Sequence, residues 1–168
     1  AWKETVEGIK AAIDAGLYVT TNTTLTKENA EAFPETMRFG KQLGLTTMGC
    51  NGLICSGKGP AKIKKDGLSS QEMKAVLSRA LEVAGELGID LVWYSPTCYK
   101  DLNPVEMGLG IKGCSAAQYN MTIEPDGRVI PCQSWIHQGC GNILKDKWET
   151  IWNNPICLGL RDRTEVLR

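Results

Sequence analysis

The chain has 168 residues, enough for one full domain or for one and a half small ones. Hydrophobic residues make up 42% of the sequence and charged residues 23%, which is ordinary for a globular protein. Lysine plus arginine equals aspartate plus glutamate, so the net charge is zero. A chain without net charge has no field that attracts nucleic acid or an anionic membrane, and neither is expected as a partner.

The apolar stretches of the sequence are strand-length, too short to span a bilayer, and no signal peptide opens the chain, so we expect a cytoplasmic protein. The seven cysteines are an odd number without a secretory signal, which favours metal binding or reactivity over a disulfide framework. Cys50 and Cys55 are interpreted as small buried hydrophobes. The sequence starts and stops in mid-pattern, so we expect a piece of a longer protein.

Three times, the sequence runs from an amphipathic helix through a glycine into a short apolar strand. Pro34 is expected to divide the second helix, and Ser69 with Glu72 forms a capping-box pattern at the start of the third. The predicted helix, glycine and strand of each unit are 2–15, Gly16 and 17–22; 26–43, Gly44 and 45–49; and 70–87, Gly88 and 89–94.

This repetition predicts an α/β fold with parallel strands covered by helices. Three units do not close a barrel. The pattern therefore leaves two alternatives, a small three-stranded α/β layer and the end of a larger barrel.

The pattern changes after Ser95-Pro96, and we place a domain boundary near residue 96. Residues 119–124 and 128–131 flank the turn dipeptide Asp126-Gly127, which predicts an antiparallel hairpin. A short helix is expected to follow, with Leu144, Trp148, Ile151 and Trp152 facing inward and Pro155 ending it.

Cys114 and Cys132 stand at the two ends of this hairpin, so the fold-back brings both thiolates toward one point. Thiolates suit zinc or an iron–sulfur cluster, and two of them are too few for either. The candidates to complete the site within this chain are Cys98, Cys140 and Cys157, with His137 as an alternative zinc ligand. A coincidence of buried thiols is the other interpretation.

The spacing Cys114, twelve residues, Gly127, four residues, Cys132 resembles the opening motif of the SPASM and twitch auxiliary-cluster domains of radical-SAM enzymes. The stretch GNILKDKWETIWNNP, residues 141–155, resembles the segment that follows the hairpin in SPASM proteins. By this resemblance, residues 1–96 are the C-terminal αβ units of a radical-SAM partial barrel. Residues 97–168 are then a truncated, α+β SPASM/twitch-like domain with a β-hairpin.

Two parts of the family pattern are absent. The CxxxCxxC motif, which holds the catalytic [4Fe–4S] cluster, is expected upstream of this chain, and the later CxxC and Cys-Gly-Gly portion is expected beyond its end. The chain as written could therefore not cleave S-adenosyl-L-methionine (SAM). No residue of this sequence is assigned a catalytic role.

The resemblance implies ligands for an auxiliary [4Fe–4S] cluster at Cys114 and Cys132, and Cys98 is the third predicted ligand. Cys140 and Cys157 are interpreted as packing residues. Contacts to SAM are expected at the exit of the first strand and in the stretch NGLICSGKG, residues 51–59. The alternative is a polar loop. The candidate SAM-binding residues are Thr21, Asn22, Thr23, Asn51, Gly57 and Gly59.

The leading hypothesis is part of a radical-SAM oxidoreductase or maturase, in which a 5′-deoxyadenosyl radical abstracts hydrogen from a peptide or from a tetrapyrrole or cofactor precursor. The auxiliary domain would transfer electrons or position the substrate, and an electron-donor protein is an expected partner. The rivals are a small zinc-stabilised binding module without catalysis and a structural fragment without metal.

Overall fold

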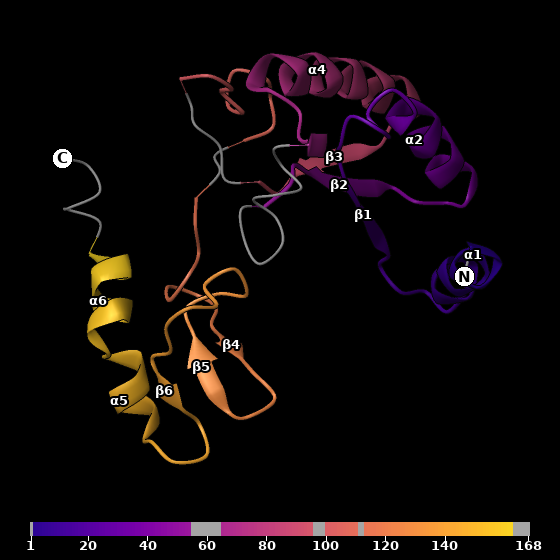
Figure 1. Cartoon of the computed structure of the whole chain (residues 1–168). Coiled ribbons are helices and arrows are strands. Elements are labelled where there is room, and N and C mark those ends of the chain that lie inside the picture. The colour runs from indigo at the N-terminus through magenta and orange to yellow at the C-terminus, as the bar shows by residue number, and fades with distance from the viewer. Residues whose placement is uncertain (1, 55–64, 96–99, 111–112, 163–168) are drawn as a thin grey trace. The chain divides into compact units, whose positions relative to one another are not determined.

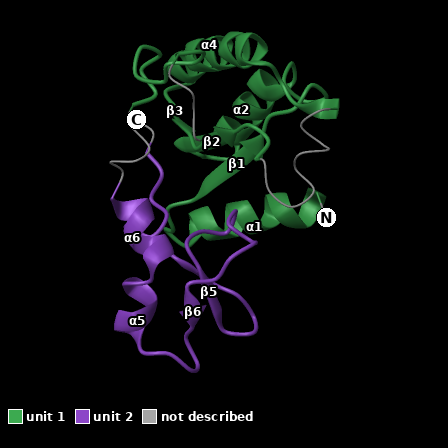
Figure 2. Ribbon diagram, turned by 60° about the vertical axis from the view of Figure 1, so that its left-hand side comes forward, with its two compact units in different colours: residues 1–54, 61–112 green, residues 55–60, 113–168 purple. Residues whose placement is uncertain are grey.

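The computed structural model describes residues 2–54, 65–95, 100–110 and 113–162 (Figure 1). The contacts divide the chain into two compact units (Figure 2). The described residues of the first unit are 2–54, 65–95 and 100–110, and those of the second are 113–162. In the described ranges, none of the helices has the length and apolar character needed to cross a bilayer.

The first unit is an α/β layer, as the sequence predicts. Its three strands pair in the order β1-β2-β3, all parallel, with Asn22 opposite Gly49 and Gly49 opposite Val92. The elements are α1 Trp2–Asp14, β1 Thr20–Thr24, α2 Phe33–Gln42, β2 Thr47–Asn51, α4 Ser70–Leu87 and β3 Asp90–Trp93.

Each strand begins one to three residues later than the sequence pattern predicts, and the helix ends supply the reason. Gly16, Gly44 and Gly88 all have positive φ. In each case the amide of the next residue donates back to a carbonyl five residues earlier, as in the 3.0 Å bond from Leu17 to Ala12. These amides close the helix ends, so the ladder of the sheet starts after them.

The predicted starts of the second and third helices have different outcomes. Around Ser69 the capping box is confirmed, because the Ser69 side chain accepts from the Glu72 amide and the Glu72 carboxylate accepts from the Ser69 amide. These hydrogen bonds hold the pKa of Glu72 below its usual range. A helix starting at Thr26 is wrong: residues 27–32 form turns, and α2 starts only at Phe33, with Pro34 in its first turn.

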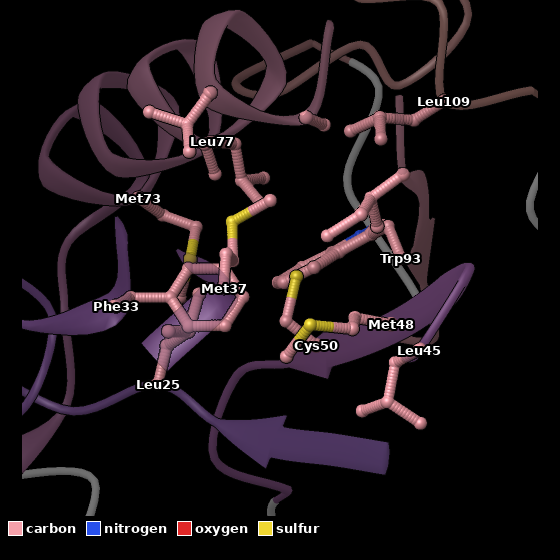
Figure 3. Packing of buried hydrophobic residues seen from close by; sticks show 14 of the residues in the cluster. Leu25, Phe33, Met37, Leu45, Met48, Cys50, Met73, Leu77, Trp93 and Leu109 are labelled. Atoms are coloured by element: carbon pink, nitrogen blue, oxygen red, sulfur yellow. The ribbon is translucent and has the colours of Figure 1, made fainter. Parts of the chain in front are cut away.

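The core of the first unit lies between the sheet and the helices α2 and α4 (Figure 3). Phe33 and Met37 of α2 meet Leu77 of α4 over Met48 and Cys50 of β2. The segment 100–110 contributes Leu102 and Leu109 to this cluster. The sequence changes in character near residue 96, whereas the contacts keep the segment 100–110 in the first unit.

The second unit is a small antiparallel sheet followed by two short helices. The strands pair in the order β4-β5-β6, and Val129, Cys140, Ile151 and Cys157 lie buried in its core. The elements are β4 Thr122–Ile123, β5 Arg128–Ile130, β6 Gly141–Asn142, α5 Trp148–Trp152 and α6 Pro155–Arg161.

The expectation for the short helix is partly wrong. Ile151 is fully buried, but Leu144 and Trp148 are exposed. Asp146 and Glu149 form a cap pattern in the sequence, but Asp146 does not cap α5, because its carboxylate accepts from the amide of Asn142. Pro155 begins α6 behind an Asn154 cap, because proline is well tolerated in the first turn of a helix.

Candidate metal centre and polar sheet face

The turn between β4 and β5 requires glycine at position 127. Gly127 has φ +83°, a conformation that side-chain-bearing residues rarely adopt. A Cβ there would lie 2.9 Å from Cγ of Leu144. The Asp126 carboxylate accepts from the Arg128 amide at 2.9 Å and fixes the turn on its other side. Local sequence thus sets the fold-back between the two cysteines of the motif.

A backbone hydrogen bond links the segments that carry Cys114 and Cys132. The Ala117 amide donates to the carbonyl of Pro131 at 3.2 Å, and Pro131 immediately precedes Cys132. Cys114 lies three residues before Ala117 and is exposed, while Cys132 is half-buried. Both sulfur-bearing segments therefore lie at the open end of the hairpin, where a metal can reach them.

The described residues supply only part of a ligand set. In the described ranges, no three His, Cys, Asp or Glu side chains come together in a way that could hold a metal ion. Cys98, the third predicted ligand, lies outside the described residues. Two thiols at the open end of one hairpin fit an iron–sulfur cluster or zinc by donor chemistry, and each of these sites takes further ligands.

Cys140 and Cys157 form a separate pair inside the second unit. Both are buried, and their two thiols share a hydrogen bond, with the sulfur atoms 3.2 Å apart. Burial, together with the hydrogen bond and charge of Cys157, raises the pKa of Cys140 to about 12. A thiol that stays protonated is a poor metal ligand, so the pair serves as packing in this structure.

We predict that Cys140 reacts with iodoacetamide about a thousandfold more slowly than an unshifted thiol at neutral pH, because its thiolate fraction falls with the shift from 9.0 to about 12. Above about pH 9 the unfolded chain deprotonates first, so this thiol lowers stability between about pH 9 and pH 12 and not below. Mass spectrometry of timed alkylation tests the predicted slow reaction of Cys140 in metal-free protein, with exposed Cys114 as the internal reference. Equal rates for Cys114 and Cys140 in the folded protein would contradict it.

A polar hydrogen-bond network lies on one face of the parallel sheet. The Oδ1 of buried Asn51 accepts from Nδ2 of Asn22 at 2.6 Å and from the Thr24 hydroxyl at 3.3 Å. The side-chain Nδ2 of Asn51 donates to the backbone carbonyl of Gly52. The backbone amide of Gly52 donates to the Ser95 hydroxyl at 2.8 Å. The structure thus brings together Asn22 and Asn51 from different strands.

Tyr94 follows β3 and lies over Gly49 on the same face. A Cβ at Gly49 would be 2.2 Å from Cε2 of Tyr94 and 3.2 Å from Oδ1 of Asn22. The sequence analysis did not single out Gly49 or Tyr94 for this site. A glycine inside a strand can mark a close approach, and that signal was available.

Thr21 and Thr23 lie on the opposite face from Asn22, because neighbouring strand residues alternate. Both line an apolar cavity of about 150 Å³ beside α1 and α2, together with residues such as Phe39. The Thr21 hydroxyl is buried and has no hydrogen-bond partner among the described residues. The structure therefore does not bring Thr21 or Thr23 together with Asn22 and Asn51. Gly57 and Gly59 lie outside the described residues.

Comparison with known proteins gives the second unit a family. Residues 114–166 match the SPASM family, described as an iron-sulfur cluster-binding domain. Residues 114–166 are therefore similar to SPASM domains. Their first and nineteenth residues are Cys114 and Cys132, so the SPASM match begins at the cysteine that the sequence analysis placed first in the motif.

A relative covers both units. The AdoMet-dependent heme synthase of Methanosarcina barkeri (strain Fusaro / DSM 804) is 25% identical to this chain over an alignment 181 residues long. The alignment covers 99% of this chain and 51% of the relative. The chain thus spans about half the length of this relative. Together with the SPASM match, this similarity supports a fragment of a radical-SAM/SPASM protein.

Proposed function

We propose that this chain is part of a radical-SAM enzyme in which Cys114 and Cys132 hold an auxiliary [4Fe–4S] cluster. The observation that carries the proposal is the link between their two segments at the open end of the hairpin, inside a SPASM domain. Cys98 is our proposed third ligand. Bound there, a cluster supplies one-electron redox chemistry, and the two cysteines would anchor it to the hairpin.

We propose the polar face of the parallel sheet as the SAM-binding face of a partial barrel. Asn22 and Asn51 are hydrogen-bonded to each other on this face, and the strand ends of such sheets are where ligands bind. The exposed amide of Asn22 can contact a polar ligand while Asn51 holds it in place. Gly57 and Gly59 remain proposed for this function on the sequence resemblance alone, whereas Thr21 lies on the opposite face of the sheet and is not part of this proposal.

The whole protein would act as an oxidoreductase through hydrogen abstraction by a 5′-deoxyadenosyl radical. Of the two substrate classes that the sequence suggests, the tetrapyrrole or cofactor precursor is favoured over a peptide, because the M. barkeri relative carries the name heme synthase. An electron-donor protein and a reducing, cytoplasmic compartment belong to the same proposal.

Anaerobic loading of the chain with iron and sulfide tests the cluster directly. We expect a brown protein with equal amounts of bound iron and sulfide, and an absorption band that bleaches on reduction. A colourless protein that binds one tight zinc and no iron would contradict the proposal and favour a zinc-stabilised module.

A further inference from the structure

Ala117 is a strained backbone position between the two cysteine segments. Its φ is +54°, and among the described residues it is the one non-glycine residue with positive φ. Its side chain is fully buried in the core of the second unit. A side-chain-bearing residue keeps this conformation only where the surroundings hold it, and such positions cluster at functional sites.

Local turn hydrogen bonds, such as that from the Ala117 amide to the Asn120 carbonyl at 3.0 Å, provide part of that hold, and Arg161 of α6 adds a long-range contact. Its Nη1 donates to the Ala117 carbonyl at 3.1 Å, and its Nη2 donates to the carbonyl of Trp152 at the end of α5. The guanidinium carbon lies 4.3 Å from the centre of the Trp152 ring. Two hydrogen bonds and one stacking contact therefore fix the guanidinium in both position and plane.

The same residue, Ala117, faces both cysteine segments. Its carbonyl accepts from Arg161. Its amide is shared between the carbonyl of Asn120 at 3.0 Å and that of Pro131 at 3.2 Å, and Pro131 directly precedes Cys132. Cys114 is three residues away along the chain. The path from Arg161 through Ala117 thus connects α6 to both sides of the open end of the hairpin.

We propose that Arg161 is a positioning residue for the metal site at Cys114 and Cys132, which it serves by holding Ala117 in its left-handed conformation. The inference rests on the proposed function, since it assumes that these two thiolates bind a cluster. A lysine keeps the charge but lacks the planar fork that reaches two carbonyls from one stacked position. Arginine is therefore required at this position for full retention of the cluster.

The test compares the wild-type chain with Arg161→Lys, Arg161→Gln and the control Arg38→Gln. Among the described residues, Arg38 forms exposed ion pairs with Glu35 and Glu86 of the first unit. After loading with iron and sulfide, transfer of iron to a chelator is timed by absorbance. We expect Arg161→Gln to lose iron about tenfold faster than wild type, Arg161→Lys to be intermediate, and the control to match wild type.

The thermal midpoint of each metal-free variant separates positioning from general stability. A lower midpoint for Arg161→Gln with an unchanged rate of iron loss would show a purely structural role and overturn the inference. If Arg161→Gln does not fold, Arg161→Lys decides, and wild-type iron loss in that variant overturns the inference. If the wild-type chain binds no iron, the proposed cluster itself is overturned. If the wild-type chain binds iron and Arg161→Gln loses it at the wild-type rate, only the proposed role of Arg161 is overturned.

Discussion

Replacement of Gly127 by valine should destabilise the second unit by about 3 kcal/mol. The φ of +83° is costly for any side-chain-bearing residue, by roughly 1–2 kcal/mol, and a β-branched residue fits it especially poorly. The new Cβ would also lie 2.9 Å from Oδ1 of Asn142, which accepts from the Leu144 amide, and displacing that side chain would cost this hydrogen bond, roughly 0.5–1.5 kcal/mol. Hydrogen exchange of the Val129 amide in β5 measures the effect locally.

Gly159→Ala is the matched control for this change. Gly159 lies in α6, and no atom comes within 4 Å of the Cβ that alanine would add. Alanine is favoured over glycine in a helix by roughly 0.5–1 kcal/mol, so the control should equal or exceed wild type in stability. Equal exchange rates for Gly127→Val and wild type would show that the turn does not need a left-handed residue.

Phe33→Ala should lower the free energy of unfolding of the first unit by about 3–5 kcal/mol. The Phe33 ring is 1% exposed and packs among Leu25, Met37 and Met73 (Figure 3). Truncation removes the buried ring and leaves a cavity beneath α2, and both terms destabilise. Urea unfolding followed by circular dichroism measures the loss, with exchange of the β2 amides to assign it to this unit.

Leu17→Ala is the control in the same unit. Leu17 is 63% exposed, and the hydrogen bond that closes α1 uses its backbone amide, which alanine keeps. The control should stay within about 0.5 kcal/mol of wild type. A similar small loss for Phe33→Ala would mean that the core shown in Figure 3 does not hold this unit together.

The sequence predicts the first unit well because its signals are local. Helix periodicity, the capping box at Ser69 and the three glycines each depend on neighbouring residues. The capping box and the glycines are confirmed, and so are the helices, except that α2 starts only at Phe33. The strand starts could not be predicted, because the amides that close the helix ends delay the ladder. The sheet also differs from the prediction for the SAM-binding residues. Neighbouring residues of β1 point to opposite faces, so Thr21 and Asn22, which were predicted to contact the same ligand, lie on different faces of the sheet.

The two functional features of the second unit differ in how far the sequence reveals them. Cys114, Gly127 and Cys132 stand at a family spacing, and the SPASM match covers them. The contact of Arg161 with Ala117 joins residues 44 positions apart and leaves no pattern in the sequence. Long-range contacts of one side chain become visible only when the fold is known.

The metal content of cysteine variants tests the central claim most directly. After anaerobic loading with iron and sulfide, we expect Cys114→Ser and Cys132→Ser each to lose most of the bound iron and its brown absorption. Cys157→Ser should keep both, because its sulfur is buried against Cys140 and away from solvent. Undiminished iron and sulfide in the Cys114→Ser, Cys132→Ser double variant would contradict a cluster at this hairpin.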